Sequence, residues 1–357
     1  MKKHHYIRTA LAAGFIALTS TAFFTPAFAD DNQAETFAPS LQIENFIGRM
    51  TIVNGETVSI TGEVDGTVAQ DKNSWHIDGG EVLRNSHCRK NKSRIEVSFG
   101  SWNWLGRSGG YKNLSDYPHL KITLPAHAHL KISDSIIFGD SENLGTADIS
   151  LDHCSDLVLG TVTGDFTLDI SGSADVKAQN IGTGDISIHG SGDVLVADVE
   201  GLDLVISGSG DFDAGYISGK TTVSVNGSGD VDIEHIQGGL DYRGNGSGDI
   251  DVDSLNGALD YNNHGSGDIV IDKIYADVVD VSLNGSGDAA LGAGKIGRIY
   301  VSTHGSGGVT FRGDAGDVDV RTRGSSDVFV RTASGEVKAN VQGSSDVKIN
   351  GVRYKRN

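Results

Sequence analysis

Aspartate residues return at a fixed interval from residue 172 onward. Each closes a four-residue signature, Gly-Ser-x-Asp or a close variant, and successive signatures start 18 to 20 residues apart. Carboxylates that repeat in this way line up when a chain coils, and calcium prefers oxygen-rich sites. Stacked carboxylates about 4.8 Å apart repel one another unless cations or hydrogen bonds compensate. The spacing therefore makes four aspartates candidate calcium ligands: Asp211, Asp230, Asp249 and Asp268.

A structural interpretation of the same aspartate column is simpler, and it is the one we favour. An aspartate side chain can accept hydrogen bonds from backbone N–H groups two residues further on, in an Asx-turn. Glycine at two signature positions permits positive φ in the same turn. Calcium-binding nonapeptide repeats also pair glycine with aspartate, but their period is about half as long. We therefore expect turn caps, with calcium as the alternative and no other cofactor.

A second candidate site combines aromatic and basic residues ahead of the repeats. Trp102, Trp104, Arg107 and Tyr111 lie in a Gly/Ser-rich stretch, and a basic cluster occupies residues 84–94. Tryptophan, tyrosine and arginine are enriched at recognition sites. The stretch can form a platform that stacks on sugar rings or docks a protein partner. It can equally form a hydrophobic lid that closes the open end of a repeat array.

Three further patterns point to little chemistry. Residues 106–110 fit the G-x-S-x-G motif, but no helix pattern follows, as a nucleophile elbow requires. His127 and His129 face one side of a predicted strand without a cysteine or carboxylate to complete a metal site, so we interpret them as surface residues. Cys88 and Cys154 are the only cysteines, and they permit one disulfide in an oxidising compartment that spacing alone does not establish.

The repeats that carry the aspartates predict a stack of short strands. Apolar residues alternate with polar ones on both sides of each signature, as in Leu202, Leu204 and Ile206, which is typical of half-buried strands. One coil cannot bury its own inner face, so successive coils must stack. The predicted fold class is all-β: a single-stranded parallel β-helix with about 19 residues per coil and an N-terminal β cap.

The start of the chain has the pattern of a secretory signal peptide. Basic residues, an apolar core and an A-x-A cleavage site occupy residues 1–29. The core is too short to span a membrane, and no 18-residue apolar run follows it. We expect export to the periplasm, the cell surface or the extracellular space. The remaining predicted segments are a disordered linker (30–40), an N-terminal β cap region (41–118), the repeat β-helix (119–352) and a basic tail (353–357).

The order of these features resembles the bacterial head-GIN-domain family, whose members are named as auto-transporter adhesin heads. The resemblance rests on an N-terminal pair of alternating strands, a tryptophan-containing segment, a strand that ends in Ile-Thr-Leu-Pro125, and the GSGDV and GSGDI repeats. It covers about Leu41 to Ile349. It implies an exported β-helical fold and an adhesin role, and it brings no established catalytic residues.

Together these features predict an exported, non-catalytic β-helical interaction or adhesin-like protein of the cell envelope. A surface glycan or a protein is the expected partner, while a formal net charge of −18 argues against nucleic acid. One alternative is a β-helical enzyme that acts on polysaccharides, which would need a catalytic groove that breaks the repeat. The repeats here run without such an insertion. The other alternative is a calcium-binding structural repeat protein.

Overall fold

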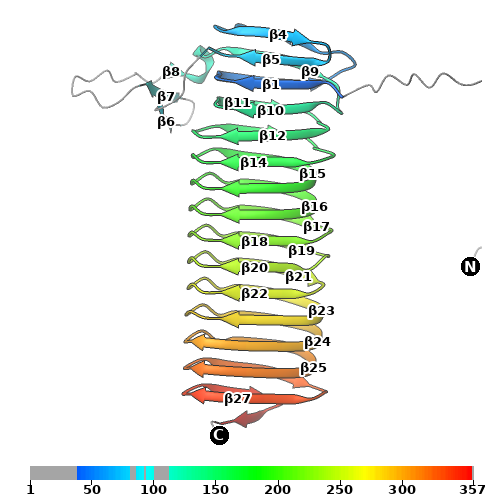
Figure 1. The fold of residues 1–357 in the computed structure, drawn as a ribbon, viewed down its shortest axis with the longest axis vertical. Helices are drawn as coiled ribbons and strands as arrows, with labels where there is room; N and C mark the ends of the chain where they lie inside the picture. Colours follow the sequence, from blue (N-terminus) through cyan, green and yellow to red (C-terminus); the bar gives the residue numbers. More distant parts are fainter. Residues whose placement is uncertain (1–37, 81–85, 92–93, 100–111, 356–357) are drawn as a thin grey trace, which may run out of the picture. The chain divides into compact units, whose positions relative to one another are not determined.

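A computed structural model describes residues 38–80, 86–91, 94–99 and 112–355. Within these residues the chain is a parallel β-solenoid of about 12 turns with about 19 residues per turn, which confirms the predicted fold class. Figure 1 shows the coils as a regular stack. The predicted signal peptide and most of the predicted linker lie outside the described residues.

Each coil contributes strands to two faces of the solenoid. Face A holds the strands that lead into a signature turn, and face B holds those that follow it. Strands confined to face A are β1 (Ser40–Glu44), β5 (Ser74–Asp78), β10 (His129–Ser133), β12 (Thr146–Leu151), β14 (Phe166–Ile170), β18 (Thr221–Val225), β20 (Leu240–Gly244), β22 (Leu259–Asn263) and β27 (Val337–Gly343). Strands confined to face B are β2 (Ile47–Asn54), β9 (His119–Leu124), β11 (Ile136–Ser141), β13 (Asp156–Leu159), β17 (Phe212–Ile217), β19 (Val231–Ile236), β21 (Ile250–Asn256), β26 (Asp327–Ala333) and β28 (Asp346–Ile349).

Longer strands bend from face B to face A without a break. They are β15 (Asp175–Ile188), β16 (Val194–Ile206), β23 (Ile269–Leu283), β24 (Ala289–Gly305) and β25 (Val309–Gly324). Short antiparallel strands cover the ends of the stack, with β3 (Ser59–Thr61) on β9, β4 (Thr67–Asp71) on β5 and β29 (Val352–Tyr354) on β28. The predicted basic tail therefore begins as a strand.

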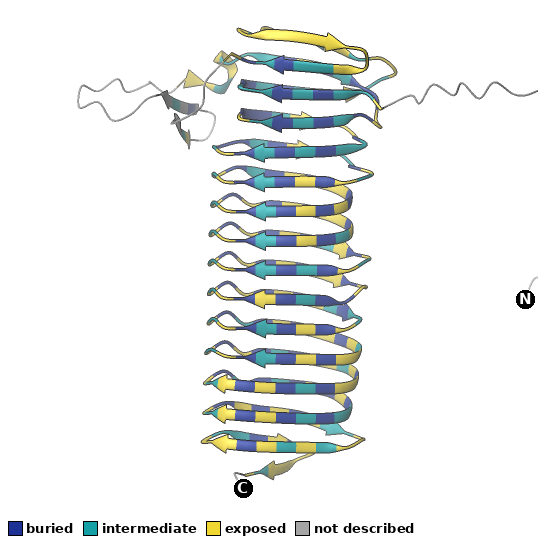
Figure 2. Cartoon of the chain, viewed as in Figure 1, coloured by how far each residue is buried: buried dark blue, intermediate teal, exposed yellow. Residues whose placement is uncertain are grey.

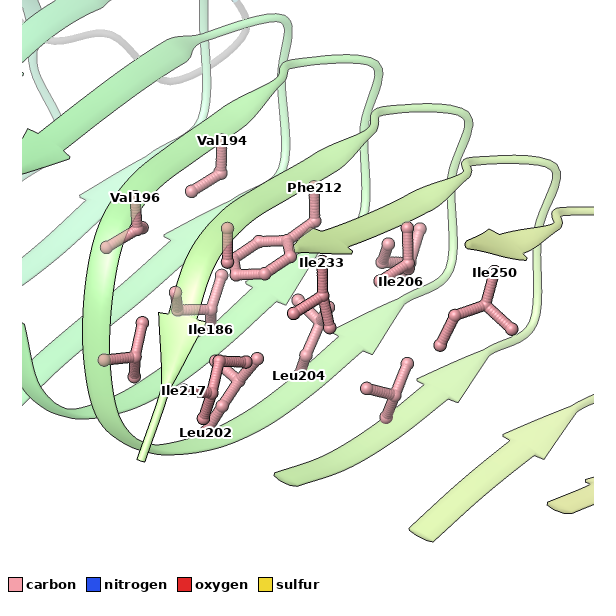
Figure 3. Close-up of a cluster of buried hydrophobic side chains, with 14 of the residues drawn as sticks. Ile186, Val194, Val196, Leu202, Leu204, Ile206, Phe212, Ile217, Ile233 and Ile250 are labelled. Atoms are coloured by element: carbon pink, nitrogen blue, oxygen red, sulfur yellow. The ribbon is translucent and has the colours of Figure 1, made fainter. Parts of the chain in front are cut away.

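Inward side chains form columns that run from coil to coil. Ile233, Val252 and Ile271 are direct partners on neighbouring strands of face B, and each is at most 2% exposed. Figure 2 shows buried residues alternating with intermediate or exposed ones along most strands. In Figure 3, Ile186 and Leu204 are among the side chains that fill the interior between the two faces. Burial of apolar surface in this continuous core stabilises the stack by about 25 cal/mol per Å².

Glycine is required in the signature turns because their backbones stack directly on one another. A Cβ atom at Gly208 or Gly227 would overlap the carbonyl oxygen of the signature glycine one coil earlier. The sequence predicts that glycine is needed for positive φ, and for most signatures this prediction is wrong. Among the first glycines of the signatures, only Gly305, Gly324 and Gly343 lie in the left-handed region, and these belong to the degenerate signatures near the C-terminal end.

The first coil of the chain is inserted between two later ones. On face A, Leu41 of β1 pairs with Trp75 of β5 on one side and with Leu130 of β10 on the other. On face B, β2 lies between β9 and β11. The region predicted as a cap thus supplies a full coil of the parallel stack. Its strands alternate apolar and polar residues as the repeats do, so their apolar side chains join the core columns of the coils on either side.

A small excursion leaves the solenoid between β5 and β9. It contains the antiparallel strands β6 (Ser86–Asn91), β7 (Arg94–Phe99) and β8 (Lys112–Asn113), followed by the 3₁₀ turn η1 (Leu114–Asp116). Cys88 of β6 is bonded to Cys154 in the turn between β12 and β13, with a Cα–Cα distance of 5.7 Å that suits a disulfide. Ile47, Ile95 and Phe138 pack around this link in a second, smaller hydrophobic cluster.

Candidate binding cleft

The predicted calcium ligands form a ladder of hydrogen bonds between coils. The backbone N–H of Asp230 donates to Oδ1 of Asp211 over 2.8 Å, that of Asp249 to Asp230 over 2.8 Å, and that of Asp268 to Asp249 over 2.7 Å. The expected Asx-turn within one signature is replaced by a bond to the following coil. Because parallel coils repeat in register, each carboxylate lies beside the backbone N–H of the corresponding aspartate in the next coil and bonds to it instead of to its own turn.

This ladder gives each of the four aspartates a structural role. Gly308 occupies the fourth signature position and has no carboxylate. Its backbone N–H still continues the ladder, because it donates to Oδ1 of Asp288 over 2.7 Å. Among the described residues, no three His, Cys, Asp or Glu side chains come together as a group that could hold a metal ion. Calcium binding by the ladder stays a prediction, and its test is given below.

Other carboxylates stack on the outer surfaces of the strands. Asp213, Asp232 and Asp251 are direct partners on face B. Partial burial, together with the charges of its neighbours, raises the pKa of Asp213 and of Asp251 above the usual value of 3.8. On face A, partial burial and the charge of Asp260 raise the pKa of Asp280. The negative charges of Asp213, Asp251 and Asp280 therefore disfavour the folded state at neutral pH.

The aromatic candidate site falls outside the described residues. Trp102, Trp104, Arg107 and Tyr111, and the G-x-S-x-G motif, belong to the segment between β7 and β8. Of the two predicted surface histidines, His127 is exposed, and Nδ1 of His129 shares a 2.7 Å hydrogen bond with Oγ1 of Thr146.

A cleft of about 700 Å³ lies where the excursion meets the first coils of the solenoid. Strands β2 and β9 supply one wall, the loop between β3 and β4 a second, and β8 with η1 a third. Its volume is in the range of small-molecule sites. Polar side chains in its lining are Arg49, Glu63, Asp65, Lys112, Ser115, Asp116, Tyr117 and His119.

Arg49 links the solenoid to the excursion at this cleft. Its Nη2 donates to the carbonyl oxygens of Ser115 and Tyr117 over 3.4 and 3.3 Å. Its Nε is buried and has no hydrogen-bond partner among the described residues. Arg49 therefore holds the 3₁₀ turn against the solenoid while its side chain lines the cleft.

His119 is the neighbour of Arg49 across the β2–β9 pair. Its Nε2 shares a 3.0 Å hydrogen bond with Oγ1 of Thr51. Burial lowers the pKa of His119, and the positive charges of Arg49 and Lys121 lower it further. The imidazole is therefore neutral at neutral pH and can both donate and accept a hydrogen bond.

Tyr117 presents a half-buried ring at the other wall. Its hydroxyl contacts the carbonyl oxygen of Ile95 at 3.5 Å, and burial together with Asp116 raises the pKa of its hydroxyl. The Nζ of Lys112 lies 5.7 Å from the ring centroid, within the range of a cation–π contact. Asp116 is itself held by the backbone N–H of Asn113. Sequence reasoning missed this site, because only the inserted coil brings Arg49 beside His119.

The repeat coils match one family of known proteins. The model of the family described as "putative auto-transporter adhesin, head GIN domain" matches residues 119–253, 213–315 and 243–352, which overlap to cover the stack from β9 to β28. The chain belongs to this family. The GIN-domain match begins at His119, so the other cleft residues precede it. No curated protein and no solved structure matches the chain. No helix in the described part of this GIN-domain protein is long and apolar enough to cross a membrane.

Proposed function

We propose that this GIN-domain protein is an exported, adhesin-like interaction protein of the cell envelope, in which the solenoid presents binding surfaces and performs no catalysis. Family membership is the observation that carries the proposal. The fold supports it, because an unbroken core column and the aspartate ladder make a long, regular scaffold. Such solenoids suit extended binding surfaces more than enclosed active sites.

Two features support export. Residues 1–29 have the composition of a signal peptide, and the Cys88–Cys154 disulfide suits an oxidising compartment. If the signal is cleaved after Ala29, the exported protein starts at Asp30. Intact mass and N-terminal sequencing of protein recovered from outside the cytoplasm test this directly. Recovery of a chain that retains residues 1–29 would contradict the assignment of a cleaved signal.

The charge distribution limits the partner. Residues 165–288 contain 23 Asp and Glu against four Lys and Arg. A body of this charge repels nucleic acid and other polyanions at physiological salt. A surface glycan of low charge, or a protein, therefore fits better. Adhesion of cells that display the full chain, compared with cells that lack it, tests the interaction role. Equal adhesion of the two strains to every host or matrix surface tried would count against it.

The segment between β7 and β8 is a further part of the proposal. Trp102, Trp104, Arg107 and Tyr111 are expected to act as an aromatic platform for the partner. The variant Trp102→Ala with Trp104→Ala should lose adhesion without a change in melting temperature. A large drop in melting temperature would instead assign the two tryptophans to a hydrophobic lid.

A further inference from the structure

We propose that the cleft between the excursion and the first coils binds the sugar residues of a neutral, hydroxyl-rich saccharide. The inference rests on the proposed interaction function and assigns it a site and a ligand class. It uses only described residues of β2, β7, β8, β9, η1, the η1–β9 connection and the β3–β4 loop.

The polar lining suits a ligand that both donates and accepts hydrogen bonds. Glu63, Asp65 and Asp116 are carboxylates, which accept hydrogen bonds from sugar hydroxyls. Arg49 and Lys112 line the cleft with guanidinium and ammonium groups, which donate hydrogen bonds. A sugar hydroxyl fills both roles at once, because its oxygen accepts from Arg49 while its hydrogen is given to a carboxylate.

The charge of the lining selects against anionic ligands. Three carboxylates face two permanent cations, and His119 is neutral because its pKa is lowered. The lining thus carries one more negative than positive charge, which disfavours anionic ligands such as a phosphate or a uronic acid. A neutral polyol avoids this penalty and uses both kinds of group.

The cleft also has an apolar side. Ile47, Val97, Tyr117 and Pro118 belong to its lining, and the Tyr117 ring is only half-buried. A pyranose ring has one face of C–H groups that packs against such a surface. A volume of about 700 Å³ is of the order needed for a ligand of roughly two sugar rings.

Its walls are held in place before any ligand binds. Arg49 is oriented by the carbonyl oxygens of Ser115 and Tyr117, and the excursion is tied to the solenoid by the Cys88–Cys154 disulfide. A preorganised site loses less conformational freedom on binding, which favours affinity. Cleavage of the disulfide should therefore lower the affinity for saccharide while leaving the stability of the repeat coils nearly unchanged.

The test uses the full exported chain and a panel of free neutral disaccharides and oligosaccharides, with binding followed by saturation-transfer NMR and titration calorimetry. Glu63 and Asp65 are exposed, so the variant Glu63→Gln with Asp65→Asn should fold normally. We expect it to bind the best saccharide at least about tenfold more weakly, as loss of charge-assisted hydrogen bonds implies. The matched control Glu234→Gln with Asp253→Asn removes two exposed carboxylates from face B, far along the chain, and should change affinity less than about twofold.

The outcomes separate this inference from the proposed function. Selective loss in the Glu63/Asp65 variant, with an unchanged melting temperature, supports the cleft. Saccharide binding that survives in that variant and in Cys88→Ser with Cys154→Ser overturns the cleft and leaves the interaction function standing. Absence of binding to every neutral saccharide overturns the ligand class, and cell adhesion that persists would then point to a protein partner. Absence of both overturns the proposed function as well.

Discussion

Replacing Gly227 by alanine tests why the signature turns are rich in glycine. An added Cβ would overlap the carbonyl oxygen of Gly208, and neither atom can rotate away, because the backbone fixes the positions of both. The coils must then separate locally. This separation strains two inter-coil hydrogen bonds, from the N–H of Ser228 to Gly208 O over 2.9 Å and from the N–H of Asp230 to Asp211 Oδ1 over 2.8 Å.

The structure sets both the sign and the size of the effect. A lost neutral hydrogen bond costs about 1 kcal/mol and one to a carboxylate about 1.5–3 kcal/mol, and overpacking adds to both. We expect Gly227→Ala to lower the free energy of unfolding by about 3–5 kcal/mol. Without the overlap the sign would be opposite, because Gly227 lacks a left-handed φ and alanine would stabilise by about 0.4–1 kcal/mol.

Urea unfolding followed by circular dichroism measures the global change. A solenoid is stabilised largely by contacts between neighbouring coils, so amide hydrogen exchange at Ser228 and Asp230 should be measured alongside it. Ser228→Ala is the matched control, since this side chain is exposed and the change should stay within about 0.5 kcal/mol. An unfolding midpoint for Gly227→Ala equal to or above that of the wild type would refute the stacking explanation.

Three further predictions follow from the columns. Val252→Asp places a charge at a core position that is 2% exposed, and it should lower the free energy of unfolding in urea by roughly 3–5 kcal/mol. Val270→Asp, at an outward position that is 39% exposed, should cost far less. Equal costs would mean that the register is wrong. Asp251→Asn should raise the melting temperature at pH 7, because the raised pKa of Asp251 means that its charge destabilises the folded state. The gain should vanish below pH 3.8, where the carboxyl is protonated in both the folded and the unfolded state. A difference in melting temperature that does not depend on pH would contradict this linkage. If the ladder is structural only, millimolar calcium should leave the melting temperature nearly unchanged, whereas a rise of many degrees that is abolished by Asp230→Asn with Asp249→Asn would establish calcium sites.

Much of the fold could be predicted because its information is local and repeated. Alternation at period 2 defines which side of a strand is buried, and a constant interval of 18 to 20 residues forces like residues into columns. The column of Ile233, Val252 and Ile271 follows from these two rules alone, and the structure confirms it. Asn263 is an exception at an inward position, where its side chain bonds within its own turn to Gly265 N and Gly267 O.

The chemistry of the turns was only half visible in the same pattern. The repeated signature shows that glycine and aspartate matter in the turns. For a single turn considered by itself, left-handed φ explains the glycine and an Asx-turn explains the aspartate as well as stacking does. Left-handed φ and an Asx-turn are properties of a single turn. Backbone overlap at Gly227 and the bond from Asp230 to Asp211 are properties of two turns in contact. Only the stacked structure distinguishes them.

The sequence by itself therefore determined the solenoid, its period, its inward columns and its family, because each follows from short-range pattern repeated many times. Tertiary structure decided the order of the coils and the cleft. Strands β1 and β5 lie some 30 residues apart, and nothing in their alternation states that β1 pairs with both β5 and β10. That choice depends on which arrangement buries the inner faces of all three strands together, and it alone brings Arg49, Tyr117 and His119 to one site.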